Sequence, residues 1–215
     1  MDGYTWLTKN RHTKQGGGVA IAIRNDIISQ VRIIDKVEPD DDTEILWVAV
    51  ENRNKGKNTH NKGLAIGIFY GPQENECRDK VEKIYSVLTT QINKIKQDHR
   101  IVLTGDFNAK LPINKNGIVQ ELSPNGRYLQ QMIDMTKTTP SSITKNKPQW
   151  TRRNRNNINE MSVIDYVITD TNENIDEIII DTEGIYRVKN KNGTETDHET
   201  ILHNKHTKTN RNRNT

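Results

Sequence analysis

The first third of the chain contains short apolar blocks that predict strands. Residues 19–23 alternate large and small apolar side chains after three glycines, which is typical of a strand with its bulky residues on one face. Residues 27–34 predict a second strand. Residues 44–50 are apolar at both parities, as expected for a strand covered on both faces. Residues 63–70 (GLAIGIFY) predict a strand that packs closely through its small residues.

Helical spacing marks the middle of the chain. Between residues 75 and 98 the apolar positions recur every three or four residues, which predicts one buried helix face. A second helix is predicted after the turn signal SPNG at residues 123–126, with Leu129, Met132 and Ile133 on its apolar side. Four more segments predict strands, namely residues 100–104, 162–169, 175–180 and 198–203.

This order of elements favours a mixed α/β (α+β) sandwich. Many strands with two helices between them exclude a helical bundle, and the helices do not alternate regularly with strands as in a doubly wound sheet. The length of 215 residues fits one domain. We predict that this domain spans residues 1–204 and that residues 205–215 form a basic, disordered tail.

Composition excludes several classes of protein. The longest apolar run, residues 45–50, is far shorter than the roughly 20 residues that span a bilayer, and the first residues contain no apolar signal segment. Cys77 is the only cysteine, so an intrachain disulfide and a cysteine-based zinc site are excluded. We therefore predict an intracellular protein without a membrane partner.

The positive charge is unevenly distributed. Lys and Arg number 32 against 28 Asp and Glu, and residues 205–215 hold four basic residues and no acid. Residues 52–62 and 145–159 also lack acids and carry four and five basic residues. Basic loops on a neutral body are typical of a polyanion-binding surface. For any one stretch, a solvated loop remains an alternative.

Polar residues at strand ends are candidates for chemistry. Asp106 and Asn108 follow a predicted strand, where a carboxylate can activate water and an amide can donate to an oxyanion, although both residues are also common in turns. Asp165 interrupts an apolar strand, so we expect it to orient a histidine or hold a cation, unless it faces water.

Two further candidates lie elsewhere in the sequence. Adjacent side chains on a strand point to opposite faces, so His198 needs an acid other than its neighbour Asp197, such as Asp165; a polar turn is the alternative. Tyr70 ends a buried strand. Its hydroxyl could bind a phosphate; the alternative is a core residue whose hydroxyl is simply exposed to water.

The motifs taken in order resemble the endonuclease/exonuclease/phosphatase superfamily. They are Y-x-P, G-D-F-N-A, W-T, S-x-I-D-Y and T-D-H, and they extend from about residue 16 to residue 202. The strongest likeness is to the apurinic/apyrimidinic-type endonuclease domains of non-LTR retrotransposons. This resemblance implies a four-layer sandwich of two packed mixed β-sheets flanked by helices.

The resemblance also implies a role for each candidate. Tyr70 would contact the scissile phosphate, and Asp106 would position or activate the attacking water. Asn108 would hold a phosphate oxygen and orient Asp106. Asp165 would orient His198, which would stabilise the pentacovalent phosphate. Asp197 would help bind a divalent cation, Mg²⁺ or Mn²⁺, directly or through water.

The implied activity is Mg²⁺-dependent phosphodiester hydrolysis that nicks DNA in the nucleus and leaves a 3′-OH. Basic loops would contact the phosphates. Trp150 would stack or wedge at the duplex beside Arg152, Arg153 and Arg155, although a core position for this Trp fits the sequence equally well. No obligate protein partner is implied.

One departure from the family pattern leaves other functions open. Members begin with an Asn-bearing strand and a strand whose Glu is the principal metal ligand, whereas only 15 residues precede Gly16 here. The expectation is that this chain lacks these first strands, with weaker metal binding and an uncovered sheet edge. An inactive relic that still binds nucleic acid, or a phosphoesterase for a small phosphoester, are the alternatives.

Overall fold

The computed structural model describes residues 2–10, 17–34, 43–51, 62–115, 117–144, 149–153, 160–170, 177–181 and 200–204, of which the last two ranges are described as backbone. No helix within these ranges is long and apolar enough to cross a membrane.

The centre of the fold is a six-stranded mixed sheet. Its order is β3 (Val31–Ile33), β4 (Glu44–Val50), β5 (Gly63–Tyr70), β6 (His99–Asp106), β12 (Asp165–Thr169) and β9 (Thr139–Pro140). Strands β5 and β6 are parallel, and the other neighbouring pairs are antiparallel.

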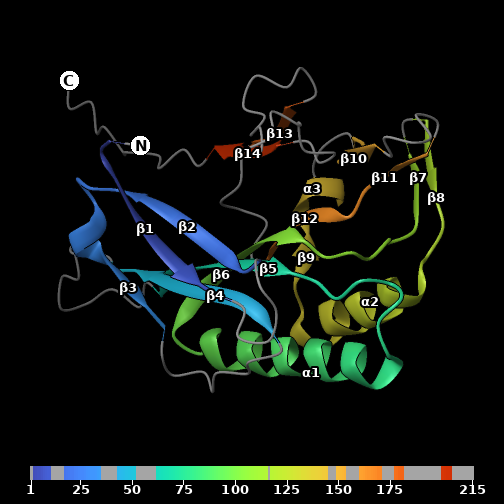
Figure 1. Cartoon of the computed structure of the whole chain (residues 1–215), viewed down its shortest axis with the longest axis horizontal. Coiled ribbons are helices and arrows are strands. Elements are labelled where there is room, and N and C mark those ends of the chain that lie inside the picture. Colours follow the sequence, from blue (N-terminus) through green and yellow to red (C-terminus); the bar gives the residue numbers. More distant parts are fainter. Residues whose placement is uncertain are drawn as a thin grey trace, which may run out of the picture.

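Two helices cover one face of this sheet (Figure 1). Helix α1 (Arg78–Ile95) connects β5 to β6, and α2 (Pro124–Thr136) packs beside it. The side chain of Ser123 caps α2, Pro124 occupies its first turn, and both are preferred at those positions. The two helices predicted from apolar spacing are therefore confirmed.

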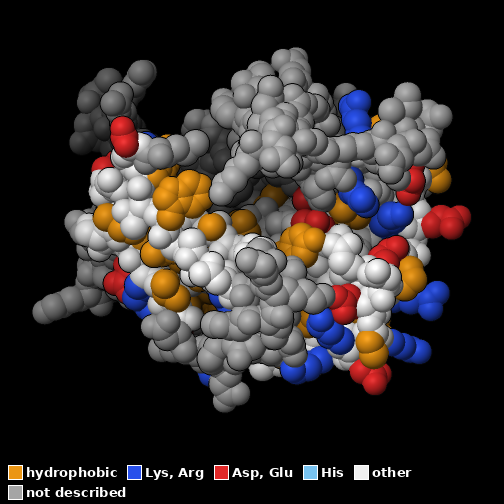
Figure 2. All heavy atoms as spheres, viewed as in Figure 1, with side chains coloured by type: hydrophobic (Ala, Val, Ile, Leu, Met, Phe, Trp, Pro, Cys, Tyr) orange, Lys and Arg blue, Asp and Glu red, His pale blue; other side chains and the backbone are white. Residues whose placement is uncertain are grey.

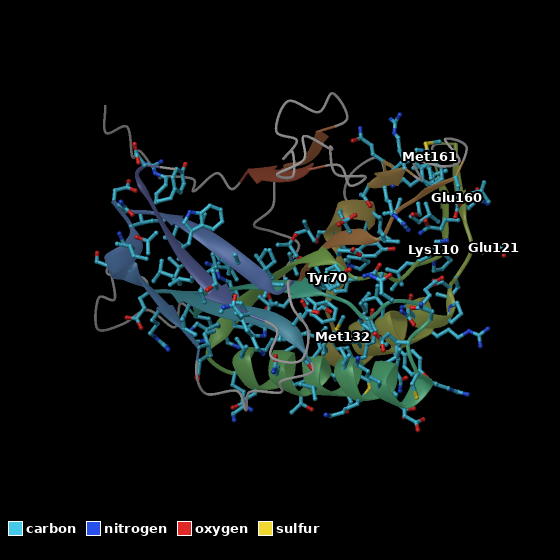
Figure 3. All side chains as sticks on the ribbon, in the orientation of Figure 1. Tyr70, Lys110, Glu121, Met132, Glu160 and Met161 are labelled. Carbon is cyan, nitrogen blue, oxygen red and sulfur yellow. The ribbon has the colours of Figure 1, made fainter. Side chains whose placement is uncertain are left out.

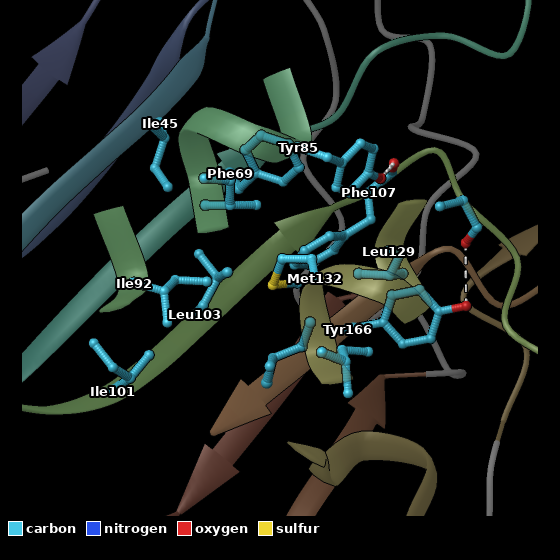
Figure 4. Packing of buried hydrophobic residues seen from close by; sticks show 14 of the residues in the cluster. Ile45, Phe69, Tyr85, Ile92, Ile101, Leu103, Phe107, Leu129, Met132 and Tyr166 are labelled. Atoms are coloured by element: carbon cyan, nitrogen blue, oxygen red, sulfur yellow. Dashed lines mark hydrogen bonds between the residues drawn. The ribbon is translucent and has the colours of Figure 1, made fainter. Parts of the chain in front are cut away.

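The core follows from the alternation of side chains along the strands. Ile101 and Leu103 of β6 point to the helices and are buried in the main core, whereas Val102 between them faces the other side of the sheet. Figure 4 shows the helix side, where the rings of Phe69, Phe107, Tyr85 and Tyr166 meet. Ring centroids there are 5.2–6.1 Å apart, within the range that favours aromatic pairing.

Paired strands lie outside the six-stranded sheet. Strand β1 (Tyr4–Lys9) pairs with β2 (Val19–Arg24), and this hairpin packs on β4 and β5 opposite the helices (Figure 1). A second antiparallel pair joins β13 (Glu177–Asp181) to β14 (Thr200–Asn204). The α/β sandwich is thus confirmed, and these strands form separate two-stranded sheets rather than one closed sheet.

Short elements complete the described chain. Strands β7 (Ile113–Lys115) and β8 (Ile118–Gln120) form one hairpin, and β10 (Arg152–Arg153) pairs with β11 (Met161–Ser162). Helix α3 (Ser141–Thr144) contacts β12.

Several strand assignments differ from the sequence prediction, which does not include the short strands β7, β8, β9 and β10. The sequence pattern does not predict β1, because its polar and apolar residues alternate between exposed and half-buried positions without a buried face. Residues 27–34 divide into a 3₁₀ turn, η1 (Ile28–Gln30), and β3. The strand predicted over residues 162–169 is divided into β11 and β12.

Candidate active site

Three predicted site residues form a row across neighbouring strands. Tyr70 at the end of β5 pairs in register with Asp106 at the end of β6, and Asp106 pairs with Asp165 at the start of β12. Residues paired in this way project to the same face of a sheet. The row lies on the face opposite α1, because Phe69, Leu103 and Tyr166, which belong to the alternate positions, are buried in the helix-side core. The fold therefore brings these side chains together from distant parts of the sequence.

The same row continues to Glu44, which sequence reasoning missed. Glu44 pairs in register with Tyr70, and its Oε2 accepts a hydrogen bond from the backbone N–H of Gly18 at 3.0 Å. This bond ties the segment leading into β2 to the start of β4. The sequence does contain one indication: Glu44 is at a position of the strand over residues 44–50 whose side chain points to the same face as Tyr70. This indication can be recognised only once the register between the strands is known.

Asn108 is held tightly against Asp106. Its backbone has φ +46°, a left-handed conformation that Asn tolerates better than most residues. Its backbone N–H donates to Asp106 Oδ1 at 2.7 Å, and its Nδ2 donates to the carbonyl oxygen of Gly71 at 3.0 Å. Asn108 thus contacts the Asp106 carboxylate through the backbone, while its side chain ties the loop after β6 to the loop after β5.

Phe107 anchors the loop between these two polar residues. Its side chain is fully buried, its backbone N–H donates to the carbonyl of Ile164 at 2.9 Å, and its own carbonyl accepts from the Tyr85 hydroxyl at 3.0 Å. An inward Phe between Asp106 and Asn108 holds both polar residues at the surface. The segment G-D-F-N-A therefore ends β6 at Asp106 and bends at Asn108, with both polar residues half-buried at this end of the strand.

Two glycines allow the site loops to approach each other. The N–H of Gly71 donates to the Asp106 carbonyl at 2.7 Å, and a Cβ on Gly71 would lie 2.1 Å from the Phe107 carbonyl oxygen. Gly105 has φ +138°, and a Cβ there would lie 1.9 Å from the Phe69 carbonyl oxygen. Any side chain at either position would separate the ends of β5 and β6.

Buried polar side chains fix the loops that carry Asp106 and Asp165. The single hydroxyl hydrogen of Tyr166 is shared between the carbonyls of Val163 (2.7 Å) and Ala109 (3.1 Å), and the hydroxyl oxygen accepts from the N–H of Leu111 (3.0 Å). Gln120 binds the carbonyl of Leu111 and both backbone groups of Val163. Burial raises the pKa of the Tyr166 phenol, so the hydroxyl keeps the proton that these bonds need.

Thr151 supports the start of β12 in a similar way. It is fully buried, and its hydroxyl accepts from the backbone N–H groups of Ile164 and Asp165 at 3.1 and 3.2 Å. The Thr of the W-T motif thus holds the backbone at the start of β12, where Asp165 lies, by hydrogen bonds. Nothing in the sequence identified this role, because its partners are backbone atoms.

Tyr70 lies at the end of β5 and is half-buried. Figure 3 shows Tyr70 near the middle of the molecule, with Lys110 to its right in this view. Its hydroxyl accepts a hydrogen bond from Gln73 Nε2 at 2.7 Å. The hydroxyl hydrogen is thus directed by a neighbour in the following loop.

The other predicted residues are distributed differently. Trp150 is partly buried and packs on the main core, which favours the core alternative over a wedge in a duplex. Arg152 and Arg153 form β10, and Arg153 is exposed. Asp197, His198 and Arg155 lie outside the described residues, as do the basic stretch 52–61 and the tail 205–215.

The donor chemistry of the row suits a hard divalent cation. Asp106 and Asp165 supply carboxylate oxygens, which Mg²⁺ prefers, and Mg²⁺ is commonly held by one or two carboxylates with water and substrate phosphate. Within the described ranges no group of three or more His, Cys, Asp or Glu side chains could hold a metal ion. The fit is therefore one of ligand type, with Asp106 and Asp165 as the candidate ligands.

A groove of about 520 Å³ lies where α1 and α2 begin. Arg78, Tyr128 and Arg127 line it together with three glutamates, and Asn125 also lines it. The bond from Arg78 Nε to the Tyr128 hydroxyl (3.0 Å) raises the pKa of Arg78. Figure 2 shows acidic and basic side chains interspersed in this part of the surface, so the groove has no single sign of charge.

The sequence of the chain matches one known protein family over more than half of its length. The profile of a family described as endonuclease-reverse transcriptase matches residues 64–202. The chain belongs to this family. The matched segment of this chain contains five of the predicted site residues, namely Tyr70, Asp106, Asn108, Asp165 and His198.

Solved structures share the fold at low sequence identity. The AP endonuclease LMAP from Leishmania major has a TM-score of 0.66 and 11% identity, covering 96% of this chain and 72% of that chain. The Xenopus laevis APE2 catalytic domain has a TM-score of 0.66 and 16% identity over 95% and 76%. A 3′ phosphatase from Neisseria, NExo, bound to a product DNA hairpin, has a TM-score of 0.62 and 16% identity over 95% and 80%. No curated protein sequence matches the chain.

These findings confirm the superfamily and the fold class. The family member has the endonuclease/exonuclease/phosphatase sandwich, a fold shared by nucleases and phosphatases. The predicted hydrolase class is confirmed at the level of the family.

Proposed function

We propose that the protein is a divalent-metal-dependent endonuclease of the retrotransposon type that nicks DNA and leaves a 3′-OH. The row of Tyr70, Asp106 and Asp165, with Asn108 bonded to the Asp106 carboxylate, carries this proposal. Membership of the endonuclease-reverse transcriptase family supports it. One structural neighbour, the Neisseria 3′ phosphatase, is bound to a product DNA hairpin, which favours DNA as the substrate.

Each residue has a chemical task that its position allows. The Asp106 carboxylate would accept a hydrogen bond from the attacking water and take its proton. The Tyr70 hydroxyl would donate to a phosphate oxygen, and Asn108 would hold another. Asp165 would orient His198, which would stabilise the charge that develops on the phosphate.

Mg²⁺ or Mn²⁺ would be held by Asp197, directly or through water, together with those carboxylate oxygens of Asp106 and Asp165 that do not bond the attacking water or His198. When bound, the ion offsets negative charge on the phosphate. The protein's own contribution is to fix the carboxylates in register on β6 and β12, so that little reorganisation is needed during the reaction.

The DNA partner would be held by charge. Arg152 and Arg153 are described on β10, and the acid-free stretches and the tail over residues 205–215 would add contacts to phosphates. Because the substrate would be chromosomal DNA, we propose that the protein acts in the nucleus. Residues 1–204 would form the catalytic domain.

Nicking of supercoiled plasmid in Mg²⁺ tests the proposal. We expect the full chain to convert plasmid to open circles, and we expect His198→Ala and an excess of EDTA to abolish conversion. Equal conversion by the wild type and His198→Ala would contradict the proposal and favour an inactive relic.

A second substrate separates DNA from a small phosphoester. Deleting residues 205–215 is expected to slow plasmid nicking, because phosphate contacts are lost, while leaving the hydrolysis of bis-p-nitrophenyl phosphate unchanged. Plasmid nicking that is insensitive to the deletion, combined with faster turnover of the small ester, would contradict the choice of DNA.

A further inference from the structure

The side chain of Asn125 joins the two loops that carry the candidate site. Asn125 lies in the first turn of α2 and is 2% exposed. Its Nδ2 donates to the carbonyl of Pro72 at 2.8 Å and to the carbonyl of Asn108 at 3.1 Å. An amide nitrogen has two hydrogens, so both are used, one on each loop.

Both loops begin at site residues. Pro72 comes two residues after Tyr70, and Asn108 comes two residues after Asp106. The loops also bond to each other, because the Asn108 side chain donates to Gly71 and the Gly71 N–H donates to Asp106. Asn125 adds a link from a third element, the helix α2, whose position is fixed by the core.

The start of α2 cannot move away from these loops without breaking several contacts. Ser123 Oγ accepts from the N–H groups of Lys110 (3.0 Å) and Gly126 (3.1 Å), and the Ser123 N–H donates to the Lys110 carbonyl at 3.1 Å. A Cβ on Gly126 would lie 2.0 Å from that carbonyl oxygen. The helix therefore abuts the loop backbone, and this holds Asn125 at a fixed depth between Pro72 and Asn108.

We propose that Asn125 is a positioning residue for the candidate site, holding the loops after β5 and β6 at the separation that keeps Tyr70, Asp106 and Asn108 on one surface. This inference rests on the proposed function. At 2% exposure Asn125 offers almost no surface to a substrate, so it acts through the loops. Two carbonyl oxygens face it, so the position requires a double donor.

Asn125→Asp removes both donors with little change in shape, and its carboxylate would repel the two carbonyls. Asn75→Asp is the matched control, because Asn75 is exposed in the loop after β5 and gives the same change in charge. If Asn125→Asp does not fold, Asn125→Ser, which keeps one shorter donor, is measured in the same way.

The first measurement is amide hydrogen exchange of the full chain, which does not depend on activity. We expect the amides of Gly71 and Asn108 to exchange at least about tenfold faster in Asn125→Asp than in the wild type. The amide of Leu111, which Tyr166 holds, is expected to change much less. Exchange at Gly71 and Asn108 that changes no more than at Leu111 would overturn the proposal.

The second measurement is nicking of a DNA substrate. We expect Asn125→Asp to lower kcat by about tenfold to a hundredfold, the scale of a displacement near 1 Å, without raising KM. The ratio of variant to wild-type kcat should recover as the pH falls, because a protonated carboxyl donates again to one carbonyl. A loss shared by Asn75→Asp, or a change confined to KM, would overturn the inference. If the wild type does not nick DNA, the proposed function fails, and the exchange rates still decide the role of Asn125.

Discussion

At the scale of single residues, the proposed chemistry depends on the Asp106 carboxylate, which accepts a backbone hydrogen bond and lies in register between Tyr70 and Asp165. Asp106 accepts a hydrogen bond from the Asn108 N–H through Oδ1, and its own backbone bonds to Gly71 and pairs with Asp165. An amide oxygen at position 106 can accept the same bond. Shape and charge can therefore be separated at this residue.

Asp106→Asn is expected to keep the fold and lose the reaction. Loss of a general base typically costs about 10²–10⁴ in rate, so kcat for plasmid nicking should fall by that factor with a nearly unchanged melting temperature. Asp98→Asn, an exposed change of the same kind, is the control and should nick as the wild type does. A kcat close to that of the wild type would remove Asp106 from the mechanism.

At the scale of elements, the close packing at the ends of β5 and β6 depends on two glycines, Gly71 just after β5 and Gly105 next to the last residue of β6, each near a backbone carbonyl of the other loop or strand. Gly105 combines a positive φ of 138° with the 1.9 Å approach that a Cβ would make to the Phe69 carbonyl oxygen. Gly117 in the turn between β7 and β8 has φ +79° and open space around its Cβ position. Both glycines therefore have a positive φ that would strain any residue with a Cβ, and they differ in crowding.

Gly105→Ala is expected to destabilise the protein more than Gly117→Ala. Left-handed strain costs about 1–2 kcal/mol in both variants, and overpacking adds about 1–3 kcal/mol at position 105 alone. Urea unfolding of both variants measures the difference. Equal losses would mean that the strands separate without cost, contrary to the close packing of their ends.

The elements also show where sequence patterns suffice and where they fail. The apolar spacing of α1 and the S-P-N-G start of α2 predicted both helices, because burial against one sheet face imposes a period that the sequence must keep. The row of Tyr70, Asp106 and Asp165 was found through motifs, whereas its register needed the fold. Glu44, Thr151 and Asn125 were missed, because a bond to a backbone atom leaves no complementary residue in the sequence.

At the scale of the whole molecule, buried phenols link stability to alkaline pH. Burial raises the pKa of Tyr85 and of Tyr166 above the ordinary value of 10. Each proton is thus held more tightly in the folded state than in the unfolded chain. This contribution to stability is complete below pH 10 and is lost as the pH rises above that value.

We expect the free energy of unfolding to fall above pH 10 by up to about 1.4 kcal/mol per pH unit for each of these tyrosines. Tyr166→Phe should be less stable at pH 7, because the N–H of Leu111 loses its acceptor, and its fall with pH should be shallower than in the wild type. Tyr4→Phe changes an exposed ring and should keep the wild-type slope. Parallel curves for the wild type and Tyr166→Phe would show that the phenol does not stay protonated in the folded state.

The net charge of +4 underestimates the positive charge that DNA would encounter, because the basic residues are grouped in a few stretches of the chain. If Arg152 and Arg153 of β10 each neutralise a phosphate, the double change Arg152→Gln and Arg153→Gln should reduce the slope of log K against log salt by about 1.8, at about 0.9 per contact. Binding should weaken at low salt, where released counterions contribute most, while the turnover of bound DNA stays near the wild-type value. Arg24→Gln removes a positive charge that is paired with Asp26 on β2 and its turn, and it should leave the slope unchanged. Fluorescence anisotropy with a labelled duplex over a salt series gives all three slopes. An unchanged slope in the double variant would assign DNA binding to other basic residues of the chain, because two fewer phosphate contacts necessarily release fewer ions.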